Sequence, residues 1–168
     1  MSGSTRARPR VPDRRHPRGL VDTSVVIEIE HIPEGALPTE IAVSAITLAE
    51  LAAGPHATGD LAERARRQDR LQRAEASFEP IPFDASTARA YGRVHAAIVG
   101  AGGKARGRRA VDLLIAATAV GAEVPLYTRN PADFAGLETL LEVVAVVRPD
   151  RRAGLAQEDH SGVHDRPR

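Results

Sequence analysis

Short apolar runs that alternate with helical patterns constrain the fold of this chain more than any other feature. Five of these runs predict strands, at residues 19–21, 41–44, 81–83, 124–128 and 143–147. The intervening patterns predict helices, over residues 24–31, 45–53, 60–77, 84–99 and 110–121. Alternation of strands and helices is typical of an α/β domain with a mainly parallel sheet. In such domains ligands bind at the carboxyl ends of the strands, so functional residues are sought there.

Local signals indicate where several of these helices begin and end. Gly54 and Pro55 are expected to end the second helix, and Asp84 is expected to begin the fourth helix as its N-cap. Residues 110–121 are apolar nearly all round, which predicts a helix in the interior of the domain. The glycine-rich and basic residues 100–107 are expected to form the loop that leads into it.

Composition excludes several classes of protein. The chain has 168 residues and no cysteine, which excludes disulfide scaffolds, thiolate zinc sites and cysteine nucleophiles. Its longest uncharged stretch, residues 113–122, is far shorter than the roughly 18 residues that a membrane span requires. We therefore expect one domain with no membrane segment, located in the cytoplasm.

Charge is distributed unevenly along the chain. Residues 1–18 are rich in Arg and Pro and are expected to form a basic, disordered arm, and residues 149–168 a polar tail. Between them, residues 20–148 contain 13 basic and 17 acidic side chains, so the domain expected over 19–148 is mildly acidic. Two basic clusters remain in it and could contact phosphate or simply be solvated: Arg64, Arg66, Arg67, Arg70 and Arg73, and Lys104, Arg106, Arg108 and Arg109.

Three carboxylates lie in apolar segments, where burial of their charge would cost free energy of folding. Asp22 follows an apolar strand, and Glu50 and Asp112 interrupt otherwise apolar helices. An ionised carboxylate that is removed from water without a partner costs several kcal/mol or more. Because these segments contain scarcely any Lys or Arg, a shared divalent cation would compensate all three. Oxygen ligands without cysteine or a histidine pair indicate Mg²⁺ or Mn²⁺ rather than zinc.

A fourth acid, Asp133, follows the strand predicted at residues 124–128 and would reach the same edge of the sheet. Each acid also has an ordinary interpretation. Asp22 could cap a helix, Asp112 could lie in a favourable first turn, Glu50 could lie at a rim, and Asp133 could be a loop acid. All four at plausible positions around one crevice favour a shared site.

Four segments, in this order along the chain, resemble the PIN domain, and in particular the ribonuclease toxins of the VapC type. They are Leu20-Val21-Asp22-Thr23-Ser24, residues 44–51 around Glu50, residues 112–117 beginning with Asp112, and residues 128–134 with Asp133. The resemblance covers about residues 19–148. It implies a three-layer α/β/α sandwich with about five strands in a mainly parallel sheet.

The resemblance also implies a function. Asp22, Glu50, Asp112 and Asp133 would be the catalytic quartet that holds Mg²⁺, for which Mn²⁺ would substitute. Supporting polar positions are Thr23, Thr128 and Asn130. The activity would be endonucleolytic RNA cleavage, and the partners would be a cognate antitoxin protein and a second copy of the chain in a homodimer.

The chemistry expected from such a site is hydrolysis by a metal-activated water, which leaves a 5′-phosphate and a 3′-hydroxyl. A metal-free route would need two histidines, and His31, His56 and His95 have no useful spacing. Candidates for contacting the RNA are Arg64, Arg67, Lys104, Arg106, Arg108 and Arg109.

Two other functions remain open. One is a catalytically silent PIN-like binding module. The other is a Mg²⁺ phosphatase with Asp22 as the nucleophile. The haloacid-dehalogenase pattern that it would follow wants a second Asp where this chain has Ser24, which disfavours the phosphatase.

Overall fold

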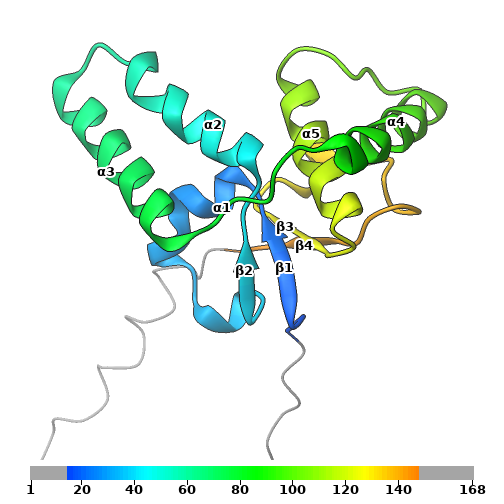
Figure 1. Cartoon of the computed structure of the whole chain (residues 1–168), viewed down its shortest axis with the longest axis horizontal. Helices are drawn as coiled ribbons and strands as arrows, with labels where there is room; N and C mark the ends of the chain where they lie inside the picture. The colour runs from blue at the N-terminus through cyan, green and yellow to red at the C-terminus, as the bar shows by residue number, and fades with distance from the viewer. Residues whose placement is uncertain (1–14, 148–168) are drawn as a thin grey trace, which may run out of the picture.

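The computed structural model describes residues 15–147, which form a four-stranded sheet between two groups of helices (Figure 1). The order of the strands is β2-β1-β3-β4, and every neighbouring pair is parallel. The bounds of the strands are Arg18–Val21 (β1), Glu40–Ala42 (β2), Leu126–Thr128 (β3) and Val143–Ala145 (β4).

Successive residues of the central strands enter two different cores. Leu20 of β1 and Leu126 of β3 are paired in register and belong to one core, while the next pair, Val21 and Tyr127, belongs to the other. Because side chains alternate between the two faces of a strand, both faces of the sheet are covered. The apolar runs in the sequence are continuous for this reason.

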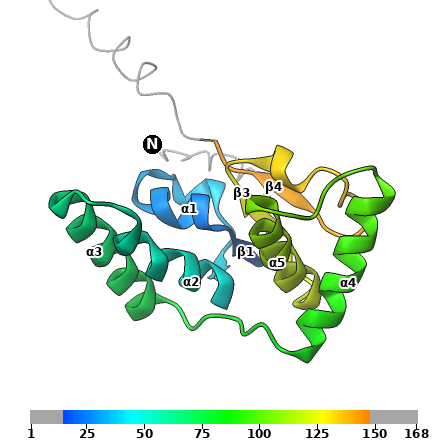
Figure 2. The same cartoon turned by 90° about the horizontal axis from the view of Figure 1, so that it is seen from above.

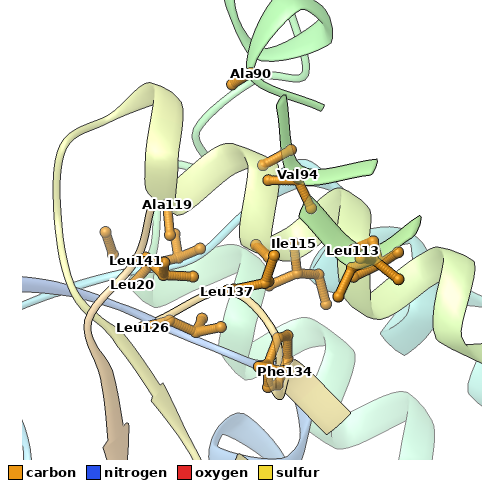
Figure 3. Packing of buried hydrophobic residues seen from close by; sticks show 14 residues of the cluster. Leu20, Ala90, Val94, Leu113, Ile115, Ala119, Leu126, Phe134, Leu137 and Leu141 are labelled. Carbon is orange, nitrogen blue, oxygen red and sulfur yellow. The ribbon is translucent and has the colours of Figure 1, made fainter. Parts of the chain in front are cut away.

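Two groups of helices cover these faces. On one face, α4 (Ala85–Gly100) and α5 (Arg108–Gly121) pack together, and their buried residues Val94 and Ile115 belong to the same cluster as the sheet residue Leu20 (Figure 3). On the other face lie α1 (Thr23–Glu28), α2 (Ala45–Ala53) and α3 (Leu61–Ser77), as Figures 1 and 2 show. The expected three-layer α/β/α sandwich is confirmed.

The path of the chain places the start of α5 at the carboxyl edge of the sheet. A short loop leads from the end of α5, at Gly121, to the start of β3, at Leu126, so the helix and the strand run in opposite directions. The start of α5 is therefore at the edge where β3 ends. A hydrogen bond of 2.9 Å, from Nη2 of Arg109 to the carbonyl of Ala135, joins the first turn of α5 to the segment that follows β3.

The strand expected at residues 81–83 is wrong in extent, which leaves four strands instead of five. Only Ile81 pairs, in a single parallel bridge with Ser44. Ile81 is flanked by Pro80 and Pro82, which have no backbone N–H to donate to a neighbouring strand. The hydrophobic residue still packs against the core, but a ladder cannot continue on either side of it.

Residues before 19 already take part in the described fold. Arg18 is the first residue of β1, and the carbonyls of His16 and Pro17 already accept hydrogen bonds from Thr39 and Glu40. The rest of the expected arm, residues 1–14, and the expected tail, residues 149–168, lie outside the described residues. Between residues 15 and 147 no helix is both long and apolar enough to cross a membrane.

Asp84 caps α4 as the sequence predicts, and we expect its contribution to stability to depend on pH. Oδ1 of Asp84 accepts hydrogen bonds from the backbone N–H of Thr87 and from the hydroxyl of Ser86. These bonds, that of the Thr87 N–H first, lower the pKa of Asp84 from 3.8 to about 2. Because its pKa is lower in the folded state, the ionised Asp84 stabilises the fold at pH values above its pKa in the unfolded chain. This stabilisation is lost as the pH falls toward the pKa in the folded state.

The test compares D84A with D84N by thermal unfolding between pH 7 and pH 2. D84A is expected to melt below the wild type at pH 7, and the difference should shrink as the pH falls from 4 to 2. Asparagine also caps helices but does not titrate, so D84N should retain most of the stability at every pH. An equal deficit of D84A at pH 2 and pH 7 would contradict the assigned role of the charged cap.

Candidate active site

Asp22 is the first residue after β1, and donors from two separate segments of the chain bond to its carboxylate. The side chain is only 7% exposed, and it caps α1 by accepting the backbone N–H of Val25 at Oδ1, at 3.1 Å. Two hydroxyls also donate to it: that of Ser24 to Oδ1 and that of Thr128 to Oδ2, each at 2.6 Å. These partners come from α1 and from the end of β3, so Asp22 joins the two central strands at their carboxyl ends.

Backbone N–H groups fix the direction of both hydroxyls. The N–H of Arg129 donates to Oγ of Ser24 at 3.1 Å, and the N–H of Asn130 donates to Oγ1 of Thr128 at 3.0 Å. Because each hydroxyl accepts one of these bonds, its own proton is left to point at Asp22. The carboxylate is thus oriented entirely by neutral donors.

Glu50 is connected to the same edge through Thr23. This half-buried carboxylate lies on α2, which Ser44 caps by accepting the N–H of Thr47. The hydroxyl of Thr23, the residue next to Asp22, donates to Oε2 of Glu50 at 2.5 Å. Among residues 15–147 no hydrogen bond is made to Oε1, so this oxygen can accept a proton or contact a ligand.

Asp112 and Asp133 are at the same edge on the other side of the sheet. Asp112 is half-buried in the second turn of α5, whose start lies where β3 ends. Asp133 is exposed in the 3₁₀ turn η4 (Pro131–Phe134), which follows β3 and contacts α5. The topology therefore brings all four acids to one edge: Asp22 and Asp133 follow the strands β1 and β3, and Glu50 and Asp112 lie on the helices α2 and α5.

The donor types at this edge suit a hard divalent cation, although the acids do not form a closed cage. Within the described part of the chain, no three Asp, Glu or His side chains are close enough together to hold one ion. Mg²⁺ is commonly held by one or two carboxylates and completes its shell with water and phosphate oxygens. Asp22 and Glu50, which the hydroxyls orient, are two carboxylates of the type that Mg²⁺ requires.

Asn130 differs from the expectation in the way it contributes. Its backbone N–H donates to Oγ1 of Thr128, and its side chain is exposed. Ser24, by contrast, donates directly to Asp22 and was not among the expected supporting residues. Its signal in the sequence is the spacing Asp-x-Ser at the start of a helix, where a hydroxyl can reach back to the capping carboxylate.

Several of the basic candidates already have partners. Arg67 bonds with Oε1 of Glu63 at 2.7 Å and with the carbonyl of Gly54 at 3.0 Å, and Arg64 bonds with the carbonyl of Thr58. The guanidinium of Arg67, followed by that of Arg66, lowers the pKa of Glu63. Arg109 bonds with Ala135, as described above. Lys104 and Arg106 are exposed in the loop before α5, and the side chain of Arg108 is outside the described part of the structure.

A pocket of about 300 Å³ opens beside Glu50. Thr23, Glu50 and Gly54 line one side of it, and Arg67 and Arg70 of α3 line the other. Substrate groups that approach Glu50 from this side would meet cationic side chains. The carboxyl edge therefore has oriented carboxylates on one side of this pocket and arginine side chains on the other.

Comparisons with known proteins show the family to which the chain is similar. The model of the PIN domain family matches residues 19–140. Ribonuclease VapC5 of Mycobacterium tuberculosis (strain ATCC 25618 / H37Rv) is 35% identical over 123 residues, which cover 71% of this chain and 87% of that protein.

Solved structures show the same fold. The crystal structure of VapBC-5, a member of the VapBC family of toxin-antitoxin systems from Mycobacterium tuberculosis, includes a chain that is 33% identical. It matches with a TM-score of 0.68 over 77% of this chain and 99% of that one. FitAcB from Neisseria gonorrhoeae is 25% identical, with a TM-score of 0.57 over 74% of this chain and 94% of that one.

Proposed function

Because this chain belongs to the PIN domain family and, within it, to the VapC ribonucleases, we propose that it is a Mg²⁺-dependent endoribonuclease. In this proposal it is the toxin of a toxin–antitoxin pair and acts in the cytoplasm. The observation that carries the proposal is the buried Asp22 carboxylate, which hydroxyls from α1 and from the end of β3 orient beside the Thr23–Glu50 pair.

The proposed site residues have separate tasks. Asp22 is the principal ligand, because hydrogen bonds from Ser24, Val25 and Thr128 fix the orientation of both of its oxygens. Glu50 is the candidate base, since Thr23 holds Oε2 and leaves Oε1 to accept the proton of an attacking water. Asp112 and Asp133 add negative charge from the other helix layer and would complete the set of ligands.

A bound Mg²⁺ or Mn²⁺ would polarise the scissile phosphate and acidify a water molecule near neutral pH. The residues around the site would then hold that water and the phosphate in line. Attack by water on phosphorus releases the 3′ oxygen of the preceding ribose and leaves a 5′-phosphate. The 2′-hydroxyl takes no part in this route.

The proposal includes two protein partners. The VapBC-5 structure is that of a member of the VapBC family of toxin-antitoxin systems, which supports a cognate antitoxin for this chain as well. A homodimer is the expected state of the toxin itself. An antitoxin that covers the carboxylate edge would block access of RNA to Asp22 and Glu50.

The experiment is RNA cleavage by the purified full chain, with Mg²⁺, with Mn²⁺ and with EDTA. We expect cleavage with either metal, none with EDTA, and products with 5′-phosphate and 3′-hydroxyl ends. A cyclic phosphate at the 3′ end would contradict hydrolysis by water. Absence of cleavage with both metals, despite RNA binding, would favour the silent binding module instead.

A further inference from the structure

Two pockets form one continuous groove between α1 and α3. The pocket beside Glu50 shares Ile27 and Arg70 with a second pocket of about 480 Å³, which continues along α3 toward Phe78. The groove therefore runs from the candidate active site along one helix layer. Arg70 lies at the junction of its two halves.

Arg70 differs from the other arginines of α3 in its contacts. Arg66 and Arg67 are bonded to Glu63, Arg64 to the carbonyl of Thr58, and Arg73 to Oε1 of Glu30 at 3.3 Å. Arg70 has no hydrogen bond and no ion pair with any residue between 15 and 147, although it is half-buried. A guanidinium carries five N–H donors and is always charged, so partial burial without an anion is unfavourable.

From this geometry we propose that Arg70 binds a backbone phosphate of the RNA strand, next to the phosphate that is cut. The inference rests on the proposed ribonuclease function. A strand whose scissile phosphate reaches Glu50 has to continue into the adjoining space, and the groove is that space. The planar fork of arginine matches two phosphate oxygens at once.

The far end of the groove also suits a single strand. Phe78 is half-buried there and offers a ring on which a base can stack. Arg66 and Arg73 also line this half, but acidic residues already pair with both, so they add less free positive charge. Arg70 is thus the cation of the groove with its full donor capacity available.

The test measures RNA binding separately from cleavage. The parent is the full chain with D22N, and the probe is a short fluorescent single-stranded oligoribonucleotide, titrated in EDTA at several KCl concentrations. Loss of one phosphate contact reduces the slope of log K against log salt by about 0.7 for a single strand. We expect that reduction for R70A, with weaker binding of every sequence tried, and an almost unchanged slope for R70K.

Arg89 provides the matched control. It is an exposed arginine on α4, on the other side of the sheet, so R89A removes the same charge away from the groove. Equal slopes for R70A, R89A and the parent would overturn the proposal. Unchanged RNA binding with weaker binding of an oligoglutamate peptide would also overturn it, and would assign Arg70 to an acidic protein partner.

Failure of this inference can be told apart from failure of the proposed function. If the wild-type chain cuts RNA while R70A shows the parental slope, only the role of Arg70 is wrong. If the wild-type chain cuts no RNA with either metal, the ribonuclease function itself is wrong. Circular dichroism of R70A and R70K checks that both variants are folded.

Discussion

Replacing Asp22 by Asn is expected to reduce RNA cleavage by about 10²- to 10⁴-fold, the range typical of a lost catalytic proton-transfer or ligand group. Asparagine has nearly the same shape and can still cap α1, but it has no negative charge with which to hold a cation. The measurement is the single-turnover rate of RNA cleavage with saturating Mg²⁺. Thermal unfolding of the same protein checks that the fold is retained.

Asp84 allows a matched control for this prediction. Like Asp22, it caps a helix and accepts a hydroxyl from the residue two positions later. It caps α4, however, far from the carboxyl ends of the strands. D84N should therefore cut RNA at the wild-type rate. Equal losses in D22N and D84N would indicate that Asp22 acts only as a cap.

The substitution T128V is expected to lower cleavage by about 10- to 100-fold, which is typical when a group that orients a metal ligand is lost. Thr128 is fully buried, and its hydroxyl donates to Oδ2 of Asp22 while it accepts the N–H of Asn130. Valine has the same shape but makes neither bond. Oδ2 of Asp22 would then lose this donor and only Oδ1 would stay held, so a higher Mg²⁺ concentration should be needed for half-maximal activity.

Two further variants separate positioning from stability. T128S restores the hydroxyl and should recover most of the activity and the normal Mg²⁺ dependence. T118V removes another buried threonine hydroxyl, one that bonds only the carbonyl of Leu114 within α5. It should leave the Mg²⁺ dependence unchanged. A loss in T128V without a shift in Mg²⁺ dependence would contradict the positioning role.

Much of the fold could be predicted from the sequence because its signals are local. Gly54 follows α2 and Asp84 caps α4, as their residue types indicate. The strand at 81–83 could not be judged in the same way. Hydrophobic residues alone favour a strand there, but Pro80 and Pro82 limit the pairing to a single bridge. The two prolines are the sequence signal for this short pairing.

The candidate site was predicted less completely. Its acids could be found because each interrupts an apolar segment or follows a strand. The resemblance named Thr128 as a supporting position, but its partner could not be predicted, because Thr128 reaches Asp22 across 106 positions of the chain and only the pairing of β1 with β3 brings them together. The pairing of Arg66 and Arg67 with Glu63 was visible as a helical spacing of three and four residues.

Leu20 and Val21 point into different cores, so the register of β1 also fixes the direction in which the next residue, Asp22, points. Adding or deleting one residue within β1 would exchange the two faces of the strand and turn Asp22 away from Thr128. Loops elsewhere can lengthen at little cost. The six residues from Arg18 to Thr23 cannot, so evolutionary length changes should avoid this stretch entirely.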